Sequence, residues 1–144
     1  MRIVINVCHG GFGLSPEASA KIEELNGRSA FFYETEADYV HGISLIVKCL
    51  NIHEKLPLFN KVMTNKKFEI GHRLSNDDFD KYVISHNDIE RNCPILLKVV
   101  EELGKEANGR FSDLKIVEIP DGVDWEIKEY DGWEHIAEKH RTWR

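Results

Sequence analysis

The chain has 144 residues, a length typical of one domain that buries a sizeable core. Its apolar fraction of 42% and its charged fraction of 31% are those of an ordinary globular protein, which argues against disorder over most of the chain. The formal net charge of −6 argues against a duplex nucleic-acid binder, because such proteins gain affinity by neutralising phosphates with Lys and Arg. A local basic pocket for a small anion is compatible with this charge.

The cysteines and the hydropathy pattern indicate the compartment. Cys8, Cys49 and Cys93 form no CxxC pair, and their odd number leaves one outside any intramolecular disulfide. The N-terminus carries no hydrophobic leader, and the longest apolar stretch, 43–50, is too short to span a bilayer. We therefore expect a cytoplasmic protein with no membrane contact.

The first elements are marked by clear signals. The β-branched run over residues 2–7 predicts an inner strand. Ser15 is a favourable N-cap, and Pro16 suits the first helical position because the missing N–H would be unpaired there anyway. A helix is therefore predicted over 16–26, and Asn26-Gly27 ends it.

The middle of the chain is harder to assign. Residues 30–33 predict a second strand. Over 37–63 the pattern fits two structures, and we favour a helix, although 43–47 would also suit a strand. The residues at helical spacing are Val40, Ile43, Val47 and Leu50. A further short helical turn is expected from Pro57, and 64–80 is expected to be an exposed connection.

The signals become clear again in the second half. Residues 81–85 predict a strand. A second main helix is predicted over 94–108, capped by Asn92 or Cys93 and ended by Asn108-Gly109. A strand is expected over 114–119.

The C-terminal part predicts a β-hairpin. Two alternating segments, 125–130 and 133–137, flank Asp131-Gly132, which is a strong hairpin-turn signal. The predicted fold class is therefore α+β: a small mixed sheet, helices 16–26 and 94–108, a possible further helical segment in 37–63, and this hairpin. We expect a single domain over 1–144.

The most informative local feature is the segment from Cys8 to Ser15, which joins the first strand to the first helix and contains Gly10, Gly11 and Gly13. These glycines match neither the P-loop nor the GxGxxG fingerprint. One interpretation is that they only allow a sharp turn. The other is that bare backbone approaches a ligand there, with Ser15 and the helix start holding a negative group and Phe12 stacking on it.

Two further places carry chemistry-bearing side chains. Arg91 precedes the second main helix and would offer phosphate a fork of donors if its segment meets the glycine loop, although a solvated arginine is the plainer interpretation. Aromatic and basic residues gather in the tail, where they suit base stacking or, more simply, packing and a subunit interface. The tail residues are Trp125, Tyr130, Trp133, His135, His140, Arg141 and Trp143.

Metal and catalytic signals are weak. The seven histidines show no zinc-ligand spacing, so no metal or other cofactor is expected. Cys8 and His9 do not form a dyad, because neighbours on a strand point to opposite faces. No nucleophile can be named, which counts modestly against an enzyme.

Several blocks of the chain resemble a group of small proteins encoded by tailed phages and prophages. The N-terminal block is Arg2-Ile-Val-Ile-Asn6 followed by Gly10-Gly-Phe-Gly-Leu-Ser15. The later blocks are Pro94 to Gly104, Ala107 to Arg110, Leu114 to Pro120, Trp125-Glu-Ile-Lys-Glu-Tyr-Asp-Gly132 and Glu138 to Trp143. The resemblance covers about half of the chain and leaves roughly 35–90 unmatched. It implies a place among phage inhibitors of bacterial immunity, some of which sequester cyclic-nucleotide or ADP-ribose-derived signals in the host cytoplasm.

Three hypotheses follow. The leading one is a noncatalytic protein that binds a nucleotide-derived signalling molecule. The others are a small hydrolase or nucleotide-modifying enzyme with His9 or a carboxylate as base, and a protein–protein inhibitor acting through its Trp-rich tail. Cys93 and the tail aromatics leave room for a homo-oligomer. The residues expected to bind the ligand are Asn6, His9, Gly10, Gly11, Phe12, Gly13, Leu14, Ser15, Arg91, Trp133 and Arg141.

Overall fold

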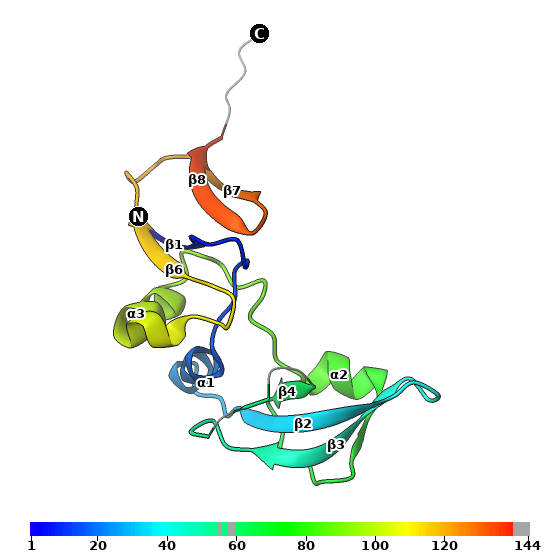
Figure 1. Ribbon diagram of the computed structural model, residues 1–144. Helices are drawn as coiled ribbons and strands as arrows, with labels where there is room; N and C mark the ends of the chain where they lie inside the picture. The colour runs from blue at the N-terminus through cyan, green and yellow to red at the C-terminus, as the bar shows by residue number, and fades with distance from the viewer. Residues whose placement is uncertain (55, 58–59, 140–144) are drawn as a thin grey trace. The chain divides into compact units, whose positions relative to one another are not determined.

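The computed structural model describes residues 1–54, 56–57 and 60–139, and these residues form an α+β fold. They group into two compact units: residues 1–22 with 86–144, of which 140–144 lie outside the described residues, and residues 23–85. Figure 1 shows the elements of both units. The expectation of one domain over 1–144 stays a prediction.

The first unit is built on an antiparallel ladder between β1 (Arg2–Asn6) and β6 (Leu114–Glu118). The helix α3 (Pro94–Leu103) contacts both strands, and β8 (Trp133–Glu138) contacts β1. In Figure 1 the ladder lies between α3 and the hairpin that β8 forms with β7 (Trp125–Tyr130).

Apolar residues at the expected periods form the core of the first unit. The β-branched run of β1 is fully buried, as an inner strand requires. Both α1 (Pro16–Leu25) and α3 bury one face, and a short 3-10 turn (Gly104–Ala107) continues α3. The buried apolar residues are Ile3, Val4, Ile5, Ala18, Ile22, Leu96, Val99, Val100 and Ala107. These elements confirm the predicted helices and the predicted strands at 2–7 and 114–119.

The predicted C-terminal hairpin is also confirmed. Tyr130 faces Trp133 across the turn, and Asp131 and Gly132 both have positive φ angles, of 48° and 84°. This is the backbone of a type I′ turn, which Asp-Gly favours.

The second unit is a four-stranded antiparallel sheet with strand order β4-β2-β3-β5. Its strands are β2 (Phe31–Asp38), β3 (Ile43–Leu50), β4 (Lys61–Thr64) and β5 (Arg73–Leu74), and α2 (Asn76–Tyr82) follows β5. Its core comprises Tyr33, Ile46, Phe68 and Leu74, against which Phe31, Val62 and Tyr82 pack.

The preference for a helix within 37–63 was wrong. Residues 43–50 form β3, which pairs with β2 on one side and with β5 on the other. The β-branched residues Ile43, Ile46 and Val47 lose rotamer freedom in a helix and pack well on a sheet, so pairing outweighs the helical spacing. The turn expected from Pro57 falls largely on 58–59, which lie outside the described residues.

The assignments for 64–80 and 81–85 also need correction. Phe68 and Leu74 are buried, so 64–80 is not merely an exposed connection. A capping box starts α2: Ser75 Oγ accepts from the N–H of Asp78, whose carboxylate accepts from the N–H of Ser75. This helix continues through Tyr82, and the predicted strand is reduced to one bridge between Val83 and Thr64.

Candidate functional site

The glycine loop, residues 8–15, packs closely against other backbone of the first unit. A Cβ added at Gly10 would overlap the carbonyl oxygen of Phe111. The turn of the hairpin reaches the loop from elsewhere in the unit, since a Cβ at Gly132 would lie 2.6 Å from both the nitrogen of Gly11 and the carbonyl oxygen of His9. The absence of side chains at Gly10 and Gly132 therefore lets three backbone segments meet.

The end of the loop is bonded to the segment before β6. Leu14 bridges Asn108, and the carbonyl of Gly13 accepts from the N–H of Gly109 at 3.2 Å and from Ser112 Oγ at 2.7 Å. The backbone N–H and the hydroxyl of Ser15 both form hydrogen bonds within the protein. Its N–H donates to Ala107, its Oγ donates to the carbonyl of Glu106, and the same Oγ accepts from the N–H of Ala18. Ser15 thus acts as the N-cap that the sequence predicts, with its donors directed into the protein.

The start of the loop is different. Within the described part of the chain, the N–H groups of Gly10, Gly11 and Phe12 have no hydrogen-bond partner. Gly10 is exposed, and Gly11 and Phe12 are half-buried. Successive unpaired N–H groups in a loop are suited to an anion. The end of the loop, Gly13 to Ser15, is thus hydrogen-bonded to the rest of the unit and holds the start of α1. The N–H groups of Gly10 to Phe12 are available as donors.

Arg91 meets the glycine loop, which was one of the two interpretations of this residue, but its guanidinium is already paired. It donates to both oxygens of Glu134, at 2.6 and 2.9 Å, and its Cζ lies 3.5 Å from the centroid of the Phe12 ring. The side chains of Arg91 and Glu134 are only 16% and 5% exposed. A bidentate buried pair of this kind leaves the arginine little free charge for a phosphate. Arg91 therefore holds the loop in place through its contact with the Phe12 ring.

Asn6 is fully buried and joins four segments. Its N–H donates to Glu134 Oε1 at 2.8 Å, and its Nδ2 donates to the carbonyls of Cys8 and Gly132 at 2.7 and 2.8 Å. Its Oδ1 accepts from the N–H of Asp113 at 2.8 Å. The side-chain nitrogen and oxygen of Asn6 are thus both hydrogen-bonded within the protein, and they hold the glycine loop against the hairpin turn.

Three aromatic rings lie at the surface where the loop and the hairpin turn meet. The ring of His9 is 5.1 Å from that of Trp133 and 6.4 Å from that of Tyr130, both with edge-to-face geometry. Tyr130 is 80% exposed and Trp133 is 45% exposed. We call His9, Tyr130 and Trp133 the ring cluster. Its rings have solvent-facing surface on which a planar group can stack.

The structure therefore brings together every predicted site residue that it describes, from Asn6 to Ser15 with Arg91 and Trp133, around one loop. Arg141 lies outside the described residues, as do His140 and Trp143. Sequence reasoning missed Glu134, which pairs with Arg91, and Phe111, which covers Gly10. No local pattern marks either residue, because both contacts join segments far apart in the chain.

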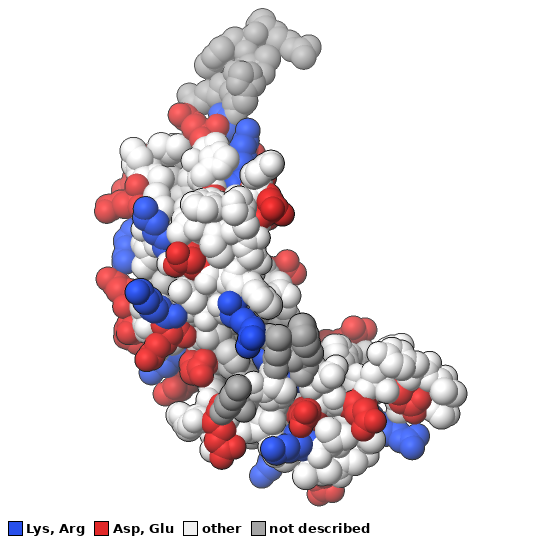
Figure 2. Space-filling model, in the orientation of Figure 1, with Lys and Arg blue, Asp and Glu red and all other residues white. Residues whose placement is uncertain are grey.

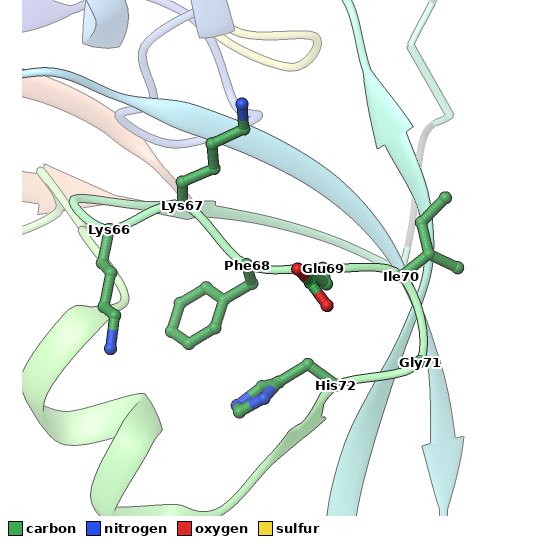
Figure 3. Close-up of a pocket in the computed structure, with 7 residues that line it drawn as sticks. All are labelled: Lys66, Lys67, Phe68, Glu69, Ile70, Gly71 and His72. Atoms are coloured by element: carbon green, nitrogen blue, oxygen red, sulfur yellow. The ribbon is translucent and has the colours of Figure 1, made fainter.

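The second unit has a pocket of about 520 Å³ on the segment between β4 and β5 (Figure 3). Figure 3 shows Lys66, the Phe68 ring and His72 on one side of this segment, while Lys67 points away from them. The rings of Phe68 and His72 lie 4.6 Å apart. The residues that line the pocket are Lys66, Lys67, Phe68, Glu69, Ile70, Gly71 and His72.

His72 is held by a carboxylate of α2. Its Nε2 lies 3.1 Å from Asp78 Oδ2. This hydrogen bond, with a smaller contribution from the backbone N–H of Ser75, lowers the pKa of Asp78 below its ordinary value of 3.8. The ionised carboxylate of Asp78 therefore fixes both the helix start and the His72 ring.

Charges of both signs are mixed over the face shown in Figure 2. The described residues include no group of three or more His, Cys, Asp or Glu side chains that could hold a metal ion. No described helix combines the length and the apolar character needed to cross a bilayer. In comparisons with protein-family models, curated proteins and solved structures, nothing matches the chain.

Proposed function

We propose that this protein binds and sequesters a nucleotide-derived signalling molecule, a cyclic oligonucleotide or an ADP-ribose derivative, without converting it. Such binding would suit an accessory protein of the phage type that counters host defence. The observation that carries the proposal is the exposed ring cluster next to the unpaired N–H groups of Gly10, Gly11 and Phe12.

The two halves of a nucleotide would use different parts of this surface. A base would stack on Trp133, and stacking on an aromatic side chain is worth about 1–3 kcal/mol per base. A phosphate would accept hydrogen bonds from the loop amides, which need no side-chain cation to act as donors. His9, between the two, would contribute a ring nitrogen.

The buried contacts beneath the ring cluster and the glycine loop would fix the conformation of this surface. Asn6 ties the loop to the hairpin turn, and Arg91 fixes Phe12 and Glu134 from the inner side. A binding surface whose backbone is already ordered loses less conformational entropy when the ligand binds. Asn6, Ser15 and Arg91 thus have positioning roles in this proposal, and the ring cluster and the loop amides make the contacts.

The direct test is to load the purified full-length protein and identify what it retains. The protein is incubated with a panel of cyclic dinucleotides and ADP-ribose isomers, separated from free compounds and heated, and the supernatant is analysed by mass spectrometry. We expect one class of compound to be recovered unchanged from the wild type and from Tyr39→Ala, and to be lost from Trp133→Ala. Tyr39 is a fair control because it is 93% exposed and belongs to the second unit.

Two other outcomes would replace the proposal. Recovery of a hydrolysed compound that depends on His9 would indicate a hydrolase. Recovery of no compound, together with a host protein captured by the wild type and lost from Trp133→Ala, would indicate a protein inhibitor, because exposed Trp and Tyr are enriched at protein interfaces.

A further inference from the structure

The pocket of the second unit has a rigid frame. The N–H of Phe68 donates to the buried hydroxyl of Tyr33 at 2.8 Å, and the N–H of Gly71 donates to the carbonyl of Ile46 at 2.8 Å. The carbonyl of His72 accepts from the N–H of Ile46 at 2.9 Å. The segment between β4 and β5 is therefore bonded to two central strands at three points, so the shape of the pocket does not depend on a ligand.

The partly exposed His72 ring lines the pocket, and the buried Phe68 ring packs against it. Phe68 is only 7% exposed, and its ring contacts those of His72 and Tyr82 at centroid distances of 4.6 and 5.6 Å. The volume of about 520 Å³ lies in the range of small-molecule sites. A pocket of this size with the His72 ring on its wall suits a ligand with a planar or apolar body.

Lys66 lines the pocket, and Lys81 of α2 lies outside the lining but beside the same Tyr82 ring as Lys66. The ammonium of Lys66 lies 5.6 Å from the Phe68 centroid and 4.9 Å from that of Tyr82, and the ammonium of Lys81 lies 5.3 Å from Tyr82. In the described residues neither lysine forms an ion pair, whereas the carboxylate of Asp78 is engaged by His72. Two ammonium groups beside one ring raise the local positive potential, which an anion would lower.

We propose that this pocket binds a small molecule in which a phosphate or carboxylate group is attached to an apolar or aromatic body. The anionic group contacts the ammonium of Lys66, and the body rests on the partly exposed His72 ring, which packs on the buried Phe68 ring. Glu69 lines the same pocket and opposes the anion, so it limits the affinity. This inference is independent of the proposed function, because all its residues belong to the second unit.

The test is an NMR titration of the ¹⁵N-labelled full-length protein with phenyl phosphate, with inorganic phosphate and phenol as comparison probes. We expect saturable shifts of the backbone amides of 66–72 with phenyl phosphate, and at least severalfold weaker binding of each comparison probe. Lys66→Gln is expected to weaken phenyl phosphate binding on the order of fivefold, and Glu69→Gln to strengthen it on the order of twofold. Lys48→Gln, which removes the same charge from β3 outside the pocket, is expected to leave the affinity unchanged.

The proposal is overturned if phenyl phosphate gives no saturable shifts in 66–72, or if Lys66→Gln and Lys48→Gln change its affinity equally. The second result would show that only net charge matters. Shifts confined to residues 9–12, 130 and 133 would also overturn it, while leaving the proposed function intact. Each variant's own spectrum reports whether it is folded.

Discussion

At the scale of single residues, the buried pair of Arg91 and Glu134 links β8, β1 and the glycine loop. Glu134 accepts from two nitrogens of Arg91 and from the backbone N–H of Asn6, and it is 5% exposed on β8. Buried charges are costly to remove from water, and they are tolerated when every donor and acceptor is paired.

Removal of the Glu134 carboxylate should therefore be severe. Glu134→Ala leaves the Arg91 charge buried without a partner and the N–H of Asn6 unsatisfied, so we expect a loss of about 3–5 kcal/mol in the free energy of unfolding. Glu129→Ala is the matched control, because Glu129 is exposed on the neighbouring strand, and its cost should stay within about 0.5 kcal/mol. Urea unfolding followed by circular dichroism measures both. Equal midpoints for the two variants would contradict this role of the pair.

Asp78 makes the stability of the second unit depend on pH. Its pKa is lowered in the folded protein, so the ionised form is favoured by folding, and the stabilisation is fully present above the ordinary value of 3.8. The stabilisation is lost as the pH falls from 3.8 through the lower, folded-state pKa. We expect Asp78→Asn to lower the free energy of unfolding at pH 7, and the difference from the wild type to shrink below about pH 3.8.

The matched variant is Asp80→Asn, whose carboxylate is exposed on the same helix. It should show no such pH-dependent difference. Denaturation midpoints measured at several pH values between 7 and 3 provide the comparison, and a constant difference for Asp78→Asn over this range would refute the proposed linkage.

The residues of the candidate site show what single-residue reasoning from sequence can reach. Ser15 as N-cap was anticipated, because capping is local and the helix start carries a clear signal. Arg91 beside the loop was only one of two interpretations, because its contact with Phe12 joins segments far apart in the chain. The partner of Arg91 was not anticipated. Glu134 follows the hairpin turn in an otherwise ordinary alternating strand, and only the folded arrangement brings its carboxylate to Arg91.

At the scale of elements, the glycine loop depends on glycine at some positions and not at others. A Cβ at Gly10 would overlap the backbone of Phe111, and backbone cannot move aside as a flexible side chain can. At Gly13 an added Cβ meets nothing within 4 Å, and the φ angle there is not one that L residues avoid. The packing therefore requires glycine at position 10 and permits a side chain at position 13.

We therefore expect Gly10→Ala to lower the free energy of unfolding by about 3 kcal/mol or more, because the loop must separate from the Phe111 segment. Gly13→Ala should be neutral or should stabilise the protein by about 0.4–1 kcal/mol, because it restricts the unfolded chain. Thermal unfolding of both variants measures the difference. A destabilised Gly13→Ala beside a normal Gly10→Ala would reverse the account of the loop.

The accuracy of the element predictions follows the kind of signal. The helices at 16–25 and 94–103 and the Asp131-Gly132 hairpin were anticipated because caps and turns act over a few residues. The strand β3 was mistaken for a helix because Val40, Ile43, Val47 and Leu50 happen to repeat at helical spacing. The structure of this segment is decided by its pairing with β2 and β5. The spacing of apolar residues within the segment does not reveal that pairing.

At the scale of the whole molecule, the element patterns correctly predicted an α+β chain, while the strand pairing had to come from the structure. The strand order and register place Arg2 opposite Glu118 and Ser44 opposite Leu74, and these residues are far apart in the sequence. The glycine loop, which the sequence singles out, is where β1, the hairpin turn and the segment before β6 meet.

The central claim is that the ring cluster beside the glycine loop binds a nucleotide. Isothermal titration calorimetry of the wild type, Trp133→Ala and Tyr39→Ala with each compound of the nucleotide panel tests it most directly. We predict saturable binding of at least one compound to the wild type and to Tyr39→Ala. Trp133→Ala should bind that compound roughly 5- to 140-fold more weakly, as expected for the loss of about 1–3 kcal/mol of stacking. Equal affinities of the wild type and Trp133→Ala, or no binding of any compound to the wild type, would contradict the account.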